Sequence, residues 1–351
     1  PDHIPQKQIS MENLNFINLI QAGIIASSLL GGSLLWLTKS KEFRGIAVLL
    51  FLIAFASSIN ILEESGLTRD WYLISPVFIM LFGPATYLAV KLLLDKKLAP
   101  IQWWHLFPVI PILMFTSYVH AVIAIGTVWR VSYAFITALL LFQYKRILDE
   151  ERSDSDDFSL SWLIWLLTIT ALFNLIDLVR LNIQQSIPYE LNLFGQGLNN
   201  TVWLVTVMVI IIKLQMQKAM PKKIEPIEIN QNNQHNTKEV QEDYRSIFTE
   251  IDTLFTQNQW FLKPRLTLNE ISNLTGLQTR DISRAINLVN DKSFNEYVND
   301  YRVEFVCTTL KADPTKSLSD IAADAGFSSK ASFNKVFKQT TGLTPTEYKL
   351  R

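Results

Sequence analysis

Two short sets of hydrogen-bonding and basic side chains in this sequence have the types and spacing of a binding site. Each set begins just after a glycine, and the two glycines, Gly276 and Gly326, are fifty residues apart. The first set is Gln278, Thr279, Arg280, Ser283 and Arg284, and the second is Ser328, Ser329, Lys330, Asn334, Lys335 and Lys338. Such side chains form hydrogen bonds with base edges and neutralise phosphates, which is the chemistry of binding in the major groove of duplex DNA.

Each set needs a helix-turn-helix to position it, and the sequence repeats the pattern of one. The repeated positions are Leu268, Ile271, Gly276 and Leu277, then Leu318, Ile321, Gly326 and Phe327. In each copy the glycine permits the positive φ of a tight turn, and the next apolar residue fills the space between two helices. The helical period then directs the polar set outward and two apolar residues inward. These inward residues are Ile282 and Ile286 in the first copy, and Phe333 and Phe337 in the second.

One long helix over residues 294–311 is predicted between the two copies. At 1.5 Å per residue it is about 27 Å long, so it can hold the two helix-turn-helix units as a rigid spacer. The two polar sets would then enter successive major-groove segments, which lie about 34 Å apart. Residues 244–351 contain 14 Lys and Arg against 12 Asp and Glu, so the positive charge of this all-α region is local.

Several short motifs occur together in the same region. They are Leu268-x-x-Ile271, Gly276, Ile282-Ser283-Arg284, Ser293-Phe294-x-x-Tyr297-x-x-x-Tyr301-Arg302-Val303, Ile321-Ala322-x-x-Ala325-Gly326-Phe327, Phe333-Asn334-Lys335-x-Phe337-Lys338 and Thr341-Gly342-x-Thr344-Pro345-x-x-Tyr348. In this combination the sequence resembles the AraC/XylS double helix-turn-helix domain, and the resemblance implies sequence-specific binding of duplex DNA by both units. The first unit departs from the family pattern, with Ile286 where Phe is common and Asn287 where Lys or Arg is common.

The residues before Met220 have a different composition. Of the 351 residues 49% are hydrophobic and 18% are charged, whereas ordinary soluble domains carry about 25% charged residues. Five segments lack Asp, Glu, Lys and Arg and are long enough to span a bilayer, namely residues 14–37, 45–62, 71–90, 158–176 and 191–212. Residues 98–144 contain one charge, Arg130, and are long enough for two spans with a turn near residues 120–126. The sequence therefore predicts seven spans.

Lys and Arg in the short loops predict how these spans are oriented. One side receives Lys39, Lys41, Arg44, Lys91, Lys96, Lys97, Lys145, Arg146, Arg152, Lys213, Lys218, Lys222 and Lys223, and the other receives Lys7 and Arg69. The basic side is the cytoplasmic side, so the N-terminus is expected outside and the DNA-binding domain inside, at the inner membrane of a bacterium. The start of the sequence shows no cleavable signal peptide, and Met11 is a candidate start.

The predicted organisation is an all-α chain of three parts. Residues 11–216 form a seven-helix transmembrane module, residues 217–243 a polar, flexible linker, and residues 244–351 the double helix-turn-helix domain. The transmembrane module resembles that of membrane-bound AraC-type regulators, chiefly through Phe82-Gly83-Pro84-x-x-Tyr87.

Ionisable residues within or near the outer ends of the spans are candidates for perceiving a signal. Asp177 and Arg180 lie three residues apart, on one face of a helix, and either form a structural ion pair or belong to a site open to the outside. The full set of candidates is Glu63, Glu64, His120, Arg130, Asp177 and Arg180, with Asn60 and Asn174 at similar depth.

Residues 149–157 form a run rich in Asp and Glu that we name the acidic segment. A solvated cytoplasmic loop is the expected structure, and a docking site is the alternative. Cys307 is expected to be a small core residue and not a redox switch. The sequence contains no catalytic motif and no metal-ligand spacing, so neither an enzyme, a cofactor nor a metal is expected.

These features predict a membrane-integrated transcription regulator whose transmembrane module perceives a signal. The expected partners are double-stranded DNA, the lipid bilayer, an unidentified signal ligand, a second copy of the chain and RNA polymerase. A membrane receptor or transporter-like protein whose cytosolic domain binds a protein partner is the alternative. Release of the DNA-binding domain by cleavage of the linker is a variant of the first prediction.

Overall fold

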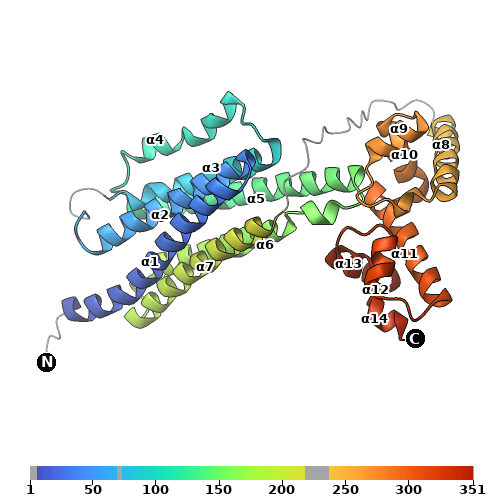
Figure 1. Cartoon of the computed structure of the whole chain (residues 1–351). Coiled ribbons are helices and arrows are strands. Elements are labelled where there is room, and N and C mark those ends of the chain that lie inside the picture. Colours follow the sequence, from blue (N-terminus) through green and yellow to red (C-terminus); the bar gives the residue numbers. More distant parts are fainter. Residues whose placement is uncertain (1–5, 69–72, 218–236, 351) are drawn as a thin grey trace. The chain divides into compact units, whose positions relative to one another are not determined.

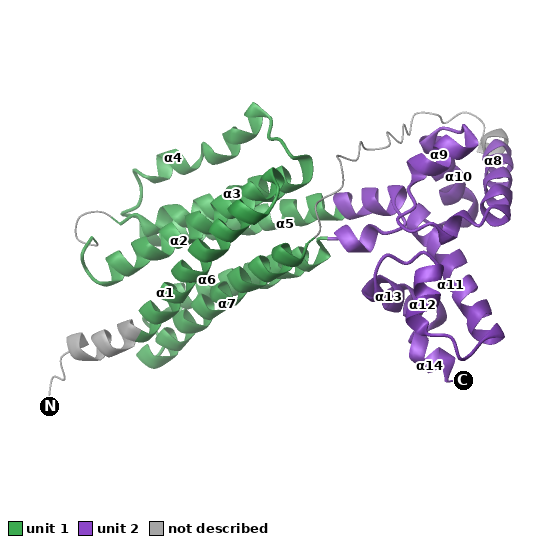
Figure 2. Ribbon diagram, in the orientation of Figure 1, with its two compact units in different colours: residues 1–142, 160–223 green, residues 143–159, 224–351 purple. Residues whose placement is uncertain are grey.

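The computed structural model describes residues 6–68, 73–217 and 237–350, and within these ranges it contains helices and no strand. The predicted all-α class is therefore confirmed. The chain divides into two compact units (Figure 2): unit 1 is Pro1–Phe142 with Leu160–Lys223, and unit 2 is Gln143–Ser159 with Ile224–Arg351. One helix, α5, begins in unit 1 and ends in unit 2.

Unit 1 is a bundle of long, apolar helices (Figure 1). They are α1 (Gln6–Thr38), α2 (Arg44–Glu64), α3 (Ser75–Asp95), α5 (Val119–Glu151), α6 (Ser161–Ile183) and α7 (Tyr189–Met216), and the one-turn helix η1 (Lys41–Phe43) precedes α2. Each of these six helices is long and apolar enough to cross a membrane.

The structure differs from the predicted seven spans between residues 98 and 144. In place of two spans it has η2 (Pro100–Leu106), the short helix α4 (Val109–Ile112) and the single long helix α5. Pro108 and Pro111 lack the N–H group that a continuing helix needs, which explains the interruption. Although they form no continuous helix, η2 and α4 run back along α3 (Figure 1). His105 stacks near Tyr87, in the C-terminal half of α3, and α4 packs against the start of α3.

Gly83 explains the Phe82-Gly83-Pro84 motif of α3. A Cβ atom at Gly83 would lie 3.1 Å from the Cα atom of Arg130 in α5. The absence of a side chain at this position therefore lets the α3 and α5 backbones approach closely. This close approach fixes the place of Arg130 within unit 1.

Unit 2 contains seven α-helices and two single helical turns among its described residues, besides the end of α5. The two single turns are η3 (Ser155–Phe158) and η4 (Trp260–Leu262). The α-helices are α8 (Thr237–Gln257), α9 (Leu268–Thr275), α10 (Thr279–Asn290), α11 (Phe294–Ala312), α12 (Leu318–Asp324), α13 (Lys330–Thr341) and α14 (Pro345–Lys349).

The predicted linker, residues 217–243, is only partly described by the structure. Residues 218–236 lie outside the described residues. Residues 237–243 form the first turns of α8, although the sequence prediction placed them in the linker. The reason is that this stretch, TKEVQED, contains no Gly or Pro and consists mainly of residues that favour helix.

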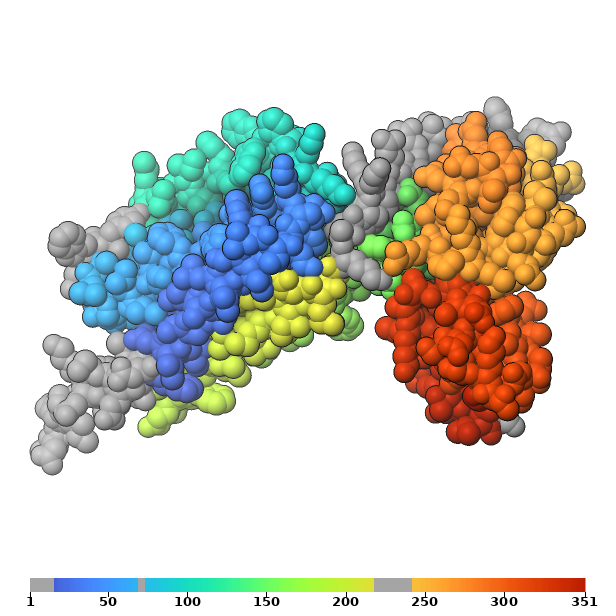
Figure 3. All heavy atoms as spheres, in the orientation of Figure 1, coloured from blue at the N-terminus to red at the C-terminus, as the bar shows by residue number. Residues whose placement is uncertain are grey.

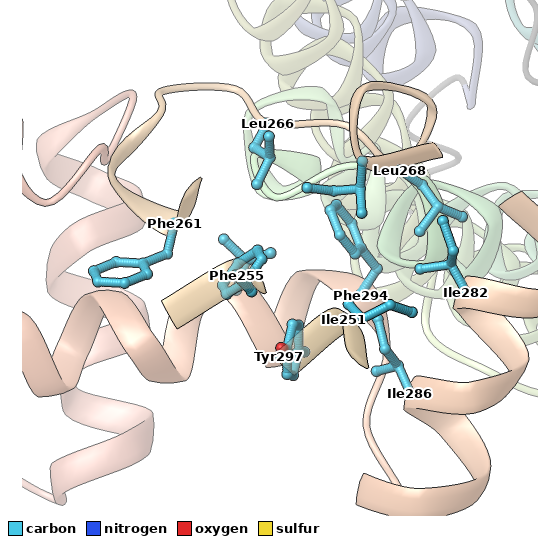
Figure 4. Packing of buried hydrophobic residues seen from close by; sticks show 11 residues of the cluster. Ile251, Phe255, Phe261, Leu266, Leu268, Ile282, Ile286, Phe294 and Tyr297 are labelled. Carbon is cyan, nitrogen blue, oxygen red and sulfur yellow. The ribbon is translucent and has the colours of Figure 1, made fainter. Parts of the chain in front are cut away.

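Two hydrophobic cores hold unit 2 together, and α11 contributes to both. The first core surrounds Phe255, with Phe294 and Tyr297 of α11 in it (Figure 4). The second contains Val303 and Val306 of α11. The predicted inward residues Ile282, Ile286, Phe333 and Phe337 are all at most 3% exposed, which confirms that they face inward. The predicted spacer helix therefore joins the two helix-turn-helix units through their cores.

Local hydrogen bonds set where these helices begin. Thr267 and Glu270 form a capping box at the start of α9, and Ser293 and Glu296 form another at the start of α11. The Ser329 hydroxyl accepts from the Ser332 N–H and caps α13. Each box satisfies N–H groups that the first turn of a helix leaves without partners.

Substitution of Gly326 by alanine is expected to destabilise unit 2 strongly. Gly326 has φ 83°, and a Cβ atom there would lie 2.5 Å from the Leu262 carbonyl oxygen. Backbone strain together with this clash should cost about 3 kcal/mol. Gly276 has φ 74°, and a Cβ atom there would meet nothing within 4 Å, so Gly276→Ala should cost only the strain, about 1 kcal/mol. Urea titration of the full chain in detergent, with protease resistance of unit 2 as the readout, measures both losses. Equal losses would contradict this account.

Candidate nucleic-acid interface

The two predicted DNA-contacting sets lie on α10 and α13, the second helix of each helix-turn-helix, and in the turns just before them. Gly276 and Gly326 both adopt positive φ in these turns. Leu277 packs against the first core and Phe327 lies within the second, as predicted for the residue after each glycine. The exposed members of the sets are Gln278, Arg280, Lys330, Asn334, Lys335 and Lys338, the half-buried ones are Thr279, Arg284, Ser328 and Ser329, and Ser283 is buried.

Neighbouring groups hold the basic side chains of α10. The Arg284 guanidinium lies over the Tyr244 ring of α8, 5.2 Å from its centroid. The Arg280 Nε lies 3.6 Å from a carboxylate oxygen of Asp281. Arg280 lies in the first turn of α10, where a helix that enters the major groove makes its base contacts, and Arg284 lies one turn further along.

The acidic segment lies against the same helices, as in the docking alternative that the sequence left open. The prediction of a solvated loop is wrong for its centre, because Ser153, Asp154 and Ser155 are each at most 2% exposed. The cause is a set of hydrogen bonds from the segment to the helices of residues 237–350, which a sequence pattern does not encode. The Asp156 carboxylate lies 2.8 Å from the Nζ of Lys335. Burial alone raises the pKa of Asp156, but the bond to Lys335 and the charge of Lys145 outweigh it, so the pKa is lowered and Asp156 stays charged at neutral pH.

Arg302 of α11 is a buried charge that the sequence showed only as part of a motif. Its guanidinium donates to the carbonyls of Phe261 at 2.8 Å and Lys263 at 2.9 Å, and to the Ser153 hydroxyl at 3.1 Å. Burial lowers the pKa of Arg302 to about 10, with the charge of Asp154 acting in the opposite direction. Arg302 therefore stays protonated at neutral pH and ties η4 and the acidic segment to α11.

Comparison with known proteins bears on this geometry. A family model described as a helix-turn-helix domain matches residues 271–351. Unit 2 carries an AraC-type helix-turn-helix domain. Domains of this type bind DNA and are not enzymes. The prediction for this domain is therefore confirmed.

Two curated proteins are similar to part of the chain. Each is the melibiose operon regulatory protein of Escherichia coli, one from strain K12 and one from O6:H1 strain CFT073. Each is 24% identical to this chain over 167 residues, which cover 47% of this chain and 54% of the relative. The chain therefore spans about half the length of the curated relatives it matches. No solved structure matches the chain.

In unit 1 the structure separates the predicted signal-binding residues. Glu63 accepts hydrogen bonds from the N–H groups at the start of α3, at 2.6 and 3.0 Å, and Glu64 accepts from Gln196 at 2.9 Å. Arg180 pairs with Asp177 at 2.8 Å. His120 is exposed. The described residues contain no group of three or more His, Cys, Asp or Glu that could hold a metal ion.

Arg130 and Asp177 line the same cavity, about 240 Å³ in volume. Asn60 and Asn174, at similar depth in the sequence prediction, line it too, as do Asn199, Asn200 and Trp203 of α7. The α7 residues were missed, although two adjacent asparagines within an apolar span are a visible signal. Among the buried polar atoms of the described residues, Arg130 Nε, Asn174 Oδ1 and Asn199 Oδ1 have no hydrogen-bond partner. The cavity can therefore donate and accept hydrogen bonds.

Proposed function

We propose that the chain is a membrane-integrated, one-component transcription regulator. Its six long helices, together with η2 and α4, which run back along α3, cross the inner membrane of a bacterium seven times. The N-terminus therefore lies outside, and the helix-turn-helix domain binds promoter DNA in the cytoplasm. The observation that carries the proposal is that one chain contains both an apolar helical bundle and an AraC-type domain, and that α5 belongs to both units. A second copy of the chain and RNA polymerase are further proposed partners.

The outer surface of unit 1 supports membrane integration. Large apolar side chains are exposed on several helices, for example Leu30 at 72%, Phe135 at 66% and Trp165 at 70%. Apolar exposure on this scale is unfavourable in water and suits contact with lipid chains. The short loops that would face the cytoplasm carry most of the Lys and Arg of this half, which supports the proposed orientation.

The cavity of unit 1 is the proposed site of signal perception. A charged side chain inside a bilayer is costly, and so it usually lines a polar site. The Arg130 guanidinium lies 5.8 Å from the Trp203 ring centroid, with its Nε free to donate. Asn174 and Asn199 offer amide oxygens that can accept. These groups fit a small molecule with an acidic group, a hydroxyl or amino group, and an apolar body that contacts Trp203.

Thiol labelling in living cells tests the proposed topology. In a Cys307→Ser background, Gln185→Cys lies in the α6–α7 loop and Lys41→Cys in the α1–α2 loop, and both positions are exposed. A membrane-impermeant maleimide is expected to label Gln185→Cys in intact cells, and Lys41→Cys only after the cells are permeabilised. The reverse pattern would overturn the orientation. Recovery of the chain in the soluble fraction would overturn membrane integration.

A further inference from the structure

The acidic segment is fixed to unit 2 by several hydrogen bonds. The Ser153 N–H donates to the Leu266 carbonyl at 3.0 Å, and Arg152 forms an antiparallel bridge with Thr267. Asn295 donates to the Arg152 carbonyl at 3.2 Å. In the space-filling view, unit 2 shows an orange part, which includes α9 and α10, and a red part, which includes α13 (Figure 3). The segment, which comprises the end of α5 and most of the connection to α6, therefore packs as an integral part of unit 2.

From this position the acidic segment contacts the start of α13. The Asp157 carboxylate accepts hydrogen bonds from the hydroxyls of Ser328 and Ser329, both at 3.0 Å. The neighbouring Asp156 accepts from the Lys335 Nζ at 2.8 Å. All three partners belong to the set predicted to contact DNA. Two carboxylates thus occupy donors that would otherwise face bases and phosphates.

The acidic segment contacts α10 in the same way. One Glu150 oxygen accepts from the Ser283 hydroxyl and from the Asn287 side-chain amide, each at 2.9 Å. Ser283 belongs to the first predicted set, and its burial against Glu150 explains why it is not exposed. Asn287 stands at the position where the family usually has a basic residue. The segment therefore engages both recognition helices at once.

We infer that the acidic segment is an autoinhibitory element that occupies the DNA-contacting face of unit 2 and competes with duplex DNA for it. The inference rests on the proposed DNA-binding function. Carboxylates placed against hydroxyl, amide and ammonium donors present the same chemistry as DNA phosphates, namely anionic oxygens that accept charge-assisted hydrogen bonds. Because one donor cannot serve both acceptors, the docked segment and bound DNA exclude each other at these residues.

Helix α5 supplies a path by which a signal could release the segment. Arg130 lines the cavity of unit 1, and Glu150, near the other end of the same helix, contacts α10. The two residues are about 30 Å apart along one continuous helix. A ligand bound at Arg130 would therefore act on the same helix that carries Glu150.

Neutral analogues of the three carboxylates test the inference in the full chain. The variant is Glu150→Gln/Asp156→Asn/Asp157→Asn, purified in detergent. The matched control, Glu250→Gln/Glu304→Gln/Asp320→Asn, removes the same charge from exposed positions on α8, α11 and α12. The probe is a labelled duplex of about 40 base pairs, long enough for two half-sites one turn apart, obtained by selection from a random pool with the neutral variant. Fluorescence anisotropy gives the affinities.

The neutral variant is expected to bind the probe at least about tenfold more tightly than the wild type, because docking leaves only a small fraction of molecules competent to bind. The affinity of the control for the probe is expected to rise less than about threefold, because only its net charge has changed. Equal affinities of variant, control and wild type would overturn autoinhibition and leave the proposed function standing. Failure of the selection to enrich any duplex, with all three proteins correctly folded, would overturn the proposed function itself.

A reversible cross-link tests the same inference without relying on the stability of the neutral variant. Asp157→Cys and Ser329→Cys, in a Cys307→Ser background, place two thiols where a hydrogen bond of 3.0 Å now joins the side chains. A short bis-methanethiosulfonate reagent is expected to weaken DNA binding at least about tenfold by holding the segment in place, and a reductant is expected to restore it. Tight binding by the cross-linked chain would overturn the inference.

Discussion

Alanine at both Lys330 and Lys335 is expected to weaken binding of the selected duplex about 100-fold, which corresponds to about 2.7 kcal/mol. Both lysines are exposed on α13, the better-matched recognition helix, and one contact of this kind with DNA contributes about 1–3 kcal/mol. The substitution is made in the background with neutral Glu150, Asp156 and Asp157 analogues. Otherwise the loss of the Lys335 to Asp156 ion pair would free the acidic segment and mask part of the effect.

The matched control for this prediction is Lys263→Ala/Lys311→Ala. Both lysines belong to unit 2 and are exposed, and neither lies on α10 or α13. The control removes the same charge, so a general electrostatic effect would weaken binding equally in the two double variants. The account predicts a much larger loss for the α13 pair, together with a shallower dependence of affinity on salt concentration. Equal losses would contradict the assignment of α13 to the DNA interface.

Arg130→Gln is expected to abolish the response to the signal while leaving DNA affinity unchanged. The substitution removes the charge that a ligand's acidic group would pair with, and it leaves α5 intact because Gln favours helix. The readout is promoter occupancy in the host, expressed as the ratio between the growth conditions of highest and lowest occupancy. We expect this ratio to fall at least about tenfold, towards one. The reason is that the ligand no longer favours the chain with a released acidic segment over the chain with a docked one.

Arg44→Gln provides the control for Arg130→Gln. It makes the same chemical change in unit 1, at the start of α2, where the guanidinium lies 4.9 Å from the Trp36 ring centroid and outside the lining of the cavity. Its occupancy ratio is expected to match that of the wild type. An unchanged ratio for Arg130→Gln would contradict the proposed site in the cavity.

The helix-turn-helix units could be predicted from the sequence because their determinants are local. Gly326 takes positive φ because the turn needs it, and Phe333 and Phe337 face inward because they share one face of a single helix. The same short-range reasoning placed Ser329 at the start of α13, where its hydroxyl caps the helix. The sequence pattern and the structure agree wherever all the residues that determine the local structure lie within one or two helical turns.

The sequence was less informative wherever distant segments meet. Apolar content predicted a span before α5, but Pro108 and Pro111 prevent a regular helix there. Hydropathy does not include the free energy that proline costs within a helix. The bond from Ser283 to Glu150 joins residues 133 positions apart, so no periodicity could indicate it. The cavity likewise draws Arg130 from α5 and Trp203 from α7, and only the packing of the helices brings them together.

Genome-wide crosslinking and sequencing of DNA bound to the tagged, full-length chain tests the central claim most directly. The experiment is done in the native host, on the membrane fraction, with two further chains in parallel. These are the background with neutral Glu150, Asp156 and Asp157 analogues, and the Lys330→Ala/Lys335→Ala variant made in that background. The account predicts discrete promoter sites in the membrane fraction that the variant loses. Sites retained equally by the variant, or no site enriched in that fraction, would contradict the claim that this chain binds promoters through α13 while it is held in the membrane.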